Sequence, residues 1–172
     1  MKLTLFDKDE KRFFPLCLTR PVGELRTGIL SIREKWVELG ANVVGHQARP
    51  ALMEKYGPIE KCPLWVDGSV IPNSELYKAL GQLEMGEQLR TENKVIAMHL
   101  KNGDISHSDI VDYKTIPFTS ALISIERIHD LFLSAEKFIS DDFKSLSQNR
   151  ASQALPEGSQ LIGPVDNLFI EE

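Results

Sequence analysis

The sequence predicts an α/β fold in which a mostly parallel, Rossmann-like sheet is flanked by helices. Two observations lead to this prediction. Short apolar runs of strand length alternate with amphipathic helical segments through the first hundred residues. The first of these segments also form a strand–loop–helix–strand unit, and such units build parallel sheets with right-handed crossovers.

The first unit covers residues 3–45. A strand is predicted at 3–6, because this apolar run stops at the charged stretch 7–12. A helix is predicted over 27–39, where apolar residues recur at spacings of three and four. Gly40 can take the left-handed conformation that ends a helix, and the apolar run at 42–45 then predicts the next strand.

The later elements continue the alternation as far as about residue 98 and become irregular beyond it. They are a short helix at 51–56, a strand at 64–66, a turn at 67–68, a helix from 73 or 74 to about 83, a strand at 95–98, an irregular connection at 101–120, a strand at 121–123 and a long helix at 125–146. The long helix is expected to pack across the sheet.

Length and composition predict one main domain. With 172 residues and 42% hydrophobic content, the chain is long enough to bury one core. The domain is predicted to cover 1–150, and 151–172 is predicted to be a linker, rich in Ser, Gln, Pro and Gly up to 163, that leads into another module.

The charge pattern and the cysteines exclude several classes of partner and site. A net charge of −5, spread over interspersed acids and bases, gives no footprint for nucleic acid or an anionic membrane. Cys17 and Cys62 are too few for a disulfide scaffold, and two packed thiols are expected. Neither a signal peptide nor a membrane span is evident, so a cytoplasmic protein without a membrane partner is expected.

Cationic side chains gather in and after the loop that follows the first strand. Five of them fall within nineteen residues: Lys8, Lys11, Arg12, Arg20 and Arg26. Open α/β sheets bind ligands at the carboxyl ends of their strands, and guanidinium groups match phosphate oxygens, so this loop is a candidate phosphate site. The alternative is solvated surface charge, offset by Asp7, Asp9, Glu10 and Glu24.

The segment 12–25 resembles the signature loop of sugar-phosphate nucleotidyltransferases, which reads Gly-x-Gly-Thr-Arg, two residues, Pro-Leu-Thr, three residues, then Pro-Lys. With Arg12 on the arginine of that loop, Pro15 and Leu16 fall on its Pro-Leu pair and Pro21 falls on its later proline, without a gap. The segment 18–36 is similar to a bacterial GlmU-like subgroup, in which such a domain precedes a left-handed β-helix of hexapeptide repeats.

This resemblance implies a reduced form of the family's three-layer α/β sandwich and a transfer of a nucleoside monophosphate from an NTP to a sugar 1-phosphate, with release of pyrophosphate. Arg12 would contact the triphosphate, and Arg26 would replace a lysine of the family loop. The residues implied to bind substrate are Lys8, Lys11, Pro15, Thr19, Arg20, Gly68 and Asn73. A C-terminal β-helix would offer a route to a homo-oligomer.

Departures from the family loop leave a second interpretation open. Lys8 and Glu10 stand where the loop has its glycines, and Val22 stands where it has its lysine. Glycine lets the backbone approach phosphate closely, which lysine and glutamate do not. The alternative is therefore a catalytically inactive nucleotide- or sugar-binding domain that regulates or scaffolds a β-helix acyltransferase.

The resemblance also implies Mg²⁺ near Asp67. The segment 64–69 is similar to a family strand that ends in Gly-Asp, whose aspartate holds Mg²⁺, and here Ser69 follows Gly68. Because a hydroxyl is a poor ligand substitute for a carboxylate, the metal site is either shifted to Asp67 or missing. For Asn73, the alternative to substrate binding is a helix N-cap.

Other polar clusters are weaker candidates. Asp7 and Asp9 have the Asp-x-Asp form of some metal sites but are predicted to be solvated. A polar turn is favoured over a metal site for the cluster His99, Asp104, His107 and Asp109. The pair His129–Asp130 is expected to cap a helix or to lie on the surface. Motifs of hydrolases, dinucleotide-binding dehydrogenases and P-loop proteins are missing.

Overall fold

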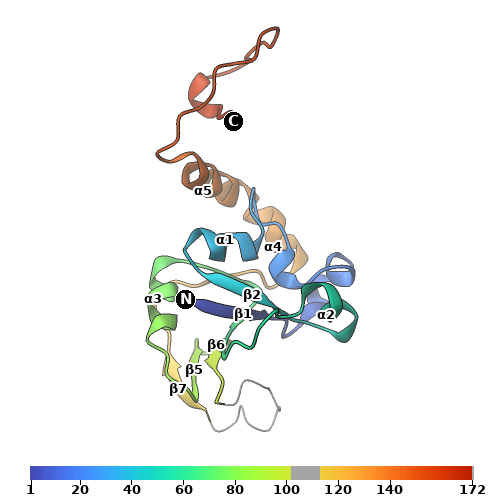
Figure 1. Ribbon diagram of the computed structural model, residues 1–172, viewed down its shortest axis with the longest axis vertical. Helices are drawn as coiled ribbons and strands as arrows, with labels where there is room; N and C mark the ends of the chain where they lie inside the picture. Colours follow the sequence, from blue (N-terminus) through green and yellow to red (C-terminus); the bar gives the residue numbers. More distant parts are fainter. Residues whose placement is uncertain (102–112, 172) are drawn as a thin grey trace.

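The computed structural model describes residues 1–101 and 113–171 and contains a six-stranded sheet flanked by helices (Figure 1). The strand order is β2-β1-β3-β6-β5-β7. The strands are β1 (Lys2–Phe6), β2 (Asn42–Gln47), β3 (Leu64–Asp67), β5 (Glu87–Arg90), β6 (Val95–His99) and β7 (Lys114–Pro117). A separate two-stranded sheet pairs β4 (Val70–Ile71) with β8 (Ile123–Ser124). The predicted α/β class, with a mostly parallel sheet, is confirmed.

One half of the sheet is parallel, as the sequence predicts. β1 pairs in parallel with β2 on one side and with β3 on the other. Leu3 and Leu5 of β1 are fully buried on one face of the sheet, where Trp36 also joins the core. On the opposite face, the rings of Phe6 and Trp65 lie 6.4 Å apart within a second, smaller apolar cluster.

The other half of the sheet differs from the prediction, because β6 runs antiparallel. The helix α3 (Ser74–Gly81) connects β3 and β4 to β5, and a tight turn then returns the chain as β6, which lies between β3 and β5. The amide of Thr91 donates to the carbonyl of Lys94 at 2.9 Å and closes this turn. Of these strands β6 is predicted by the sequence, whereas β4 and β5 are not, and β7 lies inside the segment expected to be irregular.

The helices include α1 (Ile32–Glu38), α2 (Pro50–Tyr56), α4 (Ile128–Leu133) and α5 (Ala135–Ser147). Short 3₁₀ turns, η1 (Glu10–Phe13), η2 (Leu16–Leu18) and η3 (Val22–Glu24), follow β1, and η5 (Val165–Asn167) lies near the C-terminus. The predicted long helix begins three residues late, at Ile128, and ends at Ser147, one residue beyond its predicted end, and Ser134 divides it into α4 and α5.

The helix predicted over 27–39 begins late, at Ile32, and the reason is local. Ser31 forms a capping box with Glu34, since the Ser31 hydroxyl accepts from the Glu34 amide and the Glu34 carboxylate accepts from the Ser31 amide. Before it, Gly28 has φ of +111°. The amides of Ile29 and Leu30 donate to the carboxylate of Asp142, so the segment 27–30 forms a loop.

The long helix was expected to pack across the sheet. The contacts of Asp142 show that α5 packs against α1 instead. Asp142 forms a buried ion pair with Lys35 of α1, and Phe138 is buried beside it. In Figure 1, α5 lies on the side of α1 that faces away from the sheet, and the exposed C-terminal segment extends beyond it. The predicted division at residue 150 stays a prediction.

Candidate functional site

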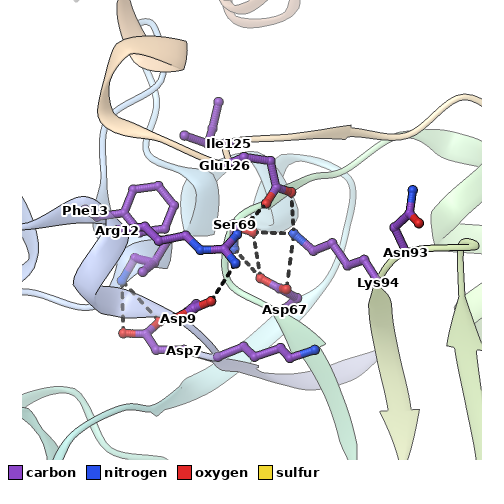
Figure 2. Close-up of a pocket in the computed structure, with 12 residues that line it drawn as sticks. Asp7, Asp9, Arg12, Phe13, Asp67, Ser69, Asn93, Lys94, Ile125 and Glu126 are labelled. Atoms are coloured by element: carbon purple, nitrogen blue, oxygen red, sulfur yellow. Dashed lines mark hydrogen bonds and ion pairs between the residues drawn. The ribbon is translucent and has the colours of Figure 1, made fainter.

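The candidate site lies where the neighbouring parallel strands β1 and β3 end. Asp67 is the last residue of β3 and is in register with Phe6, the last residue of β1, so Asp7 follows at the same edge. A polar cavity of about 100 Å³ opens there (Figure 2). Since ligand pockets measure roughly 300–1,000 Å³, this cavity matches one phosphate-sized group and not a whole nucleotide.

Asp67 is buried in the floor of the cavity, and both of its carboxylate oxygens are engaged. Oδ1 accepts from the Ser69 amide at 2.9 Å and from the Ser69 hydroxyl at 2.7 Å. Oδ2 lies 3.2 Å from the ammonium nitrogen of Lys94. Charge-assisted hydrogen bonds of this kind hold a buried carboxylate in a fixed orientation.

Lys94 lies at the centre of the cavity and contacts three oxygen-bearing side chains. Its Nζ atom is 2.8 Å from Oγ of Ser69 and 2.9 Å from Oε1 of Glu126, in addition to its contact with Asp67. Figure 2 shows these three contacts converging on the ammonium group. Because β6 is antiparallel to β3, the residue that precedes β6 lies at the edge where β1 and β3 end.

Glu126 bridges Lys94 and Arg12. Its Oε2 atom lies 3.2 Å from Nη1 of Arg12, while Oε1 contacts Lys94 and accepts from the hydroxyl of Ser124. Burial raises the pKa of the Glu126 carboxyl, but the hydrogen bonds from Ser124 and Lys94 and the two positive charges outweigh this effect and lower it. A carboxylate thus occupies the space between the two cations.

Asp7 also lines the cavity, and burial raises its pKa to about 7. The amide of Val22 donates to both of its oxygens at 3.2 Å and partly offsets the shift, whereas the negative charges of Glu10 and Asp67 add to it. Asp7 is therefore half-protonated near neutral pH. A solvated charge is the expectation from the sequence, whereas the structure shows Asp7 half-buried.

Of the five predicted cations, Arg12 and Lys8 line the cavity. Arg12 lies on η1 and pairs with Asp9 at 2.7 Å as well as with Glu126. Four further predicted residues are exposed on the chain around η1 and η2 and are not among the residues that line the cavity, namely Lys11, Pro15, Thr19 and Arg20.

Arg26, Gly68 and Asn73 also lie outside the set of lining residues. Arg26 is on the loop before α1, and its guanidinium donates to the carbonyl of Ile29. Gly68 forms the turn after β3, where an added Cβ would lie 3.2 Å from Oδ1 of Asp7. Asn73 is the N-cap of α3, since its Oδ1 accepts from the Leu76 amide at 2.8 Å. The N-cap alternative therefore accounts for it.

A wider recess of about 590 Å³ is lined by Arg12, Arg127, Ile128 and His129. Arg12 is common to the recess and the cavity, which therefore adjoin each other. His129 lies 3.5 Å from the carboxylate of Asp130, as expected for a surface pair, and Asp130 accepts from the amides of Glu126 and Arg127. The recess adds cationic surface beside the cavity.

Lys94 and Glu126 are the site residues that the sequence analysis missed. A strand at 95–98 that ran parallel to β1 and β3 would have placed Lys94 at the opposite edge of the sheet. The short polar turn 91–94 was the available signal, because two strands joined by so few residues must be antiparallel. Glu126 is brought into the cavity by the pairing of β8 with β4, which no motif predicts.

Among residues 1–101 and 113–171, no group of three or more His, Cys, Asp or Glu side chains is arranged to hold a metal ion. Of the predicted cluster only His99 is described, so the polar turn stays a prediction. Nδ1 of His99 contacts the carbonyl of Leu83 at 2.7 Å. Asp104, His107 and Asp109 lie outside the described residues. Cys17 and Cys62 are buried free thiols, as expected.

Comparisons with known proteins identify one family. A family model described as sugar nucleotidyl transferase matches residues 3–151, which is most of the chain. No curated protein and no solved structure matches significantly. Within residues 1–101 and 113–171, none of the helices is long and apolar enough to cross a membrane.

Proposed function

We propose that this chain, which belongs to the sugar nucleotidyl transferase family, transfers a nucleoside monophosphate from an NTP to a sugar 1-phosphate and releases pyrophosphate. The reaction would take place at the cavity between β1, β3 and β6, with the rest of the substrates in the adjoining recess. The GlmU-like subgroup, a C-terminal β-helix, a homo-oligomer formed through it and a cytoplasmic location stay predictions from the sequence.

The observation that supports this proposal best is the meeting of Arg12 and Lys94 at one phosphate-sized cavity. Arg12 comes from the loop after β1, and Lys94 comes from the turn before β6. A single carboxylate, that of Glu126, contacts both cations. A phosphoryl oxygen pair has the same charge and a similar span, so a substrate phosphate can replace it.

The proposed transfer needs positioning and charge stabilisation more than covalent help. An oxygen of the sugar phosphate forms a bond to the α-phosphorus of the NTP, the bond from that phosphorus to the bridging oxygen of the β-phosphate breaks, and pyrophosphate leaves with the electron pair. Negative charge therefore grows on the leaving group. Cations fixed by ion pairs before the substrate arrives, such as Arg12 and Lys94, stabilise this charge without reorganisation.

Members of this family generally use a divalent metal ion. The residues around Asp67 do not fit one as they are arranged here, because Oδ1 is engaged by Ser69 and an ammonium group lies against Oδ2. The Mg²⁺ expected at Asp67 thus competes with Lys94 for the same carboxylate. For this reason the proposed chemistry is assigned to Arg12 and Lys94 alone.

A specific observation favours the second candidate, a catalytically inactive binding domain. The signature loop of the family has two glycines, and in this chain Lys8 and Glu10 stand in their places. Glu10 also pairs with Arg49. No close backbone approach to phosphate is built into this loop. Such a domain would bind the nucleotide or sugar phosphate but would not turn it over.

Pyrophosphate release from a panel of NTPs and sugar 1-phosphates tests the proposal. Wild-type protein should release pyrophosphate only when both substrates are present. Arg12→Ala should lower the rate by about 10²–10³-fold, as removal of one oxyanion-stabilising donor does. Arg150→Ala is the matched control, since Arg150 pairs with Glu171 at 2.9 Å in the exposed C-terminal segment. Substrate binding without turnover would support the second candidate, and lack of binding would contradict both.

A further inference from the structure

We propose that Lys94 is the resident cation of this cavity and occupies the place beside Asp67 that a divalent metal ion would take. The free protein then does not bind a divalent ion at Asp67, and removal of the ammonium group creates a site for one. The inference rests on the proposed function only in taking this cavity as the substrate site.

The first support is the match between the ammonium group and its neighbours. An ammonium has three N–H donors and no acceptor. Around Nζ of Lys94 lie three acceptors, two from the end of β3 and its following turn and one from the segment after β8, namely Ser69 Oγ at 2.8 Å, Asp67 Oδ2 at 3.2 Å and Glu126 Oε1 at 2.9 Å. The number of partners and their distances are those of a fully satisfied lysine.

The second support is that the same distances exclude a metal ion in this arrangement. Magnesium binds oxygen at about 2.0–2.1 Å in a near-octahedral shell. An ion this close to Oδ2 of Asp67 would lie against the ammonium group, and the two positive charges would repel each other strongly in a poorly solvated site. Ser69, which donates to Oδ1, blocks the other oxygen.

The third support is that Lys94 is held in place from both of its ends. Its carbonyl accepts from the amide of Thr91 at 2.9 Å, which fixes the turn before β6. Its side chain is only 16% exposed, and Asp67 beside it is 6% exposed. If the ammonium group left the cavity, the carboxylates of Asp67 and Glu126 would face each other without a cation between them. The ammonium group therefore has no low-energy alternative position.

The fourth support is the chemistry of the oxygens that Lys94 contacts. Without the ammonium group, the carboxylates of Asp67 and Glu126 and the hydroxyl of Ser69 face one small space. One or two carboxylates completed by water form a usual shell for Mg²⁺ or Mn²⁺. Lys94→Met should therefore convert an ammonium site into a metal site.

Titration with Mn²⁺, followed by the electron paramagnetic resonance signal of the free ion, tests this inference without any substrate. The proteins compared are wild type, Asp67→Asn, Lys94→Met, Lys94→Gln, Lys94→Arg and the double variant Lys94→Met with Asp67→Asn. Lys114→Met is the matched control, because Lys114 also pairs with a glutamate, Glu87, at 2.8 Å but does not line the cavity. Thermal melting of each variant identifies any that fails to fold.

We expect Lys94→Met and Lys94→Gln each to bind one Mn²⁺ per chain. Their affinity should be at least tenfold higher than that of wild type, Lys94→Arg or Lys114→Met. The double variant should lose this binding. Stoichiometric binding by wild type that Asp67→Asn abolishes would overturn the inference. So would equally weak binding by wild type and both neutral Lys94 variants. Pyrophosphate release is measured separately on wild type, so failure of the proposed function leaves the Mn²⁺ result decisive.

Discussion

Lys35 and Asp142 form a buried ion pair although 107 positions separate them in the sequence. Asp142 also accepts from the amides of Ile29 and Leu30 at 3.0 Å, so one carboxylate holds together α1, its preceding loop and α5. That loop connects α1 to η3, whose first residue, Val22, donates to Asp7 in the cavity. The C-terminal helix therefore supports the segment that borders the site.

Asp142→Ala should destabilise the protein by about 3–5 kcal/mol, because it leaves a buried ammonium and two amides without their partner. Asp141→Ala is the control, since Asp141 pairs with Lys137 at 3.0 Å on the exposed face of the same helix and should cost less than about 1 kcal/mol. Urea unfolding of both variants checks this difference. Equal midpoints would show that the buried pair contributes no more than the exposed one.

Gly28→Ala should cost more than about 1 kcal/mol, since alanine avoids a φ of +111° and its Cβ would lie 2.7 Å from Oδ2 of Asp142. Gly81→Ala, at the end of α3, meets nothing within 4 Å and should leave the free energy of unfolding unchanged or slightly raised. Thermal melting distinguishes the two substitutions. A Gly28→Ala protein as stable as wild type would contradict the tight contact between this loop and Asp142.

Asp7→Asn should stabilise the protein at alkaline pH. Burial raises the pKa of Asp7 from its ordinary value of 3.8 to about 7. The folded state therefore favours the protonated acid, and the stability that this acid contributes is present below pH 3.8 and is lost as the pH rises through 7. Asparagine mimics the protonated form and can still accept from Val22.

The advantage of Asp7→Asn over wild type should grow between about pH 4 and pH 7 and stay constant above, reaching up to about 4 kcal/mol at 1.36 kcal/mol per pKa unit. Urea unfolding at pH 5 and pH 8.5 measures it. Asp166→Asn, in the exposed C-terminal segment, should match wild type at both pH values. An advantage that is the same at both pH values would refute the raised pKa.

Glu126→Gln should strengthen the binding of polyphosphate. The carboxylate of Glu126 occupies the space between Arg12 and Lys94, and an incoming phosphate must displace it. A neutral amide competes less well, so the affinity for tripolyphosphate in EDTA should rise roughly threefold to tenfold, or about 0.6–1.4 kcal/mol. Calorimetric titration measures this affinity.

Glu92→Gln provides the comparison for Glu126→Gln, because Glu92 is exposed on the β5–β6 turn and does not line the cavity. It should bind tripolyphosphate as wild type does. If Glu126→Gln binds more weakly than wild type, the carboxylate orders the two cations for the ligand and does not compete with it.

The sequence predicts those parts of the fold that depend on local pattern. The strand–loop–helix–strand unit at the start of the chain follows from hydrophobic periodicity. The loop after β1, which is rich in acidic and basic side chains, is identified by the segment 12–25. Arg12 and Asp67 were found in this way, because each lies at the end of a recognisable strand or motif.

The rest of the site depends on pairings that local pattern does not determine. Lys94 reaches the cavity only because β6 turns back on β5, and Glu126 reaches it because β8 pairs with β4. Arg26 seemed well placed in the sequence but donates to the neighbouring Ile29, since Gly28 and Asp142 bend the chain there. These outcomes depend on long-range contacts that a single sequence does not display.

The strand order has a consequence for how the sheet can assemble during synthesis. Strand β1 is made first, and β2 and β3 then join its two sides. The β5–β6 hairpin joins the open edge of β3 through β6, and β7 joins the open edge of β5. No existing pairing has to separate to admit a later strand. A nascent chain can therefore build this sheet outwards, with the β5–β6 hairpin added as one unit.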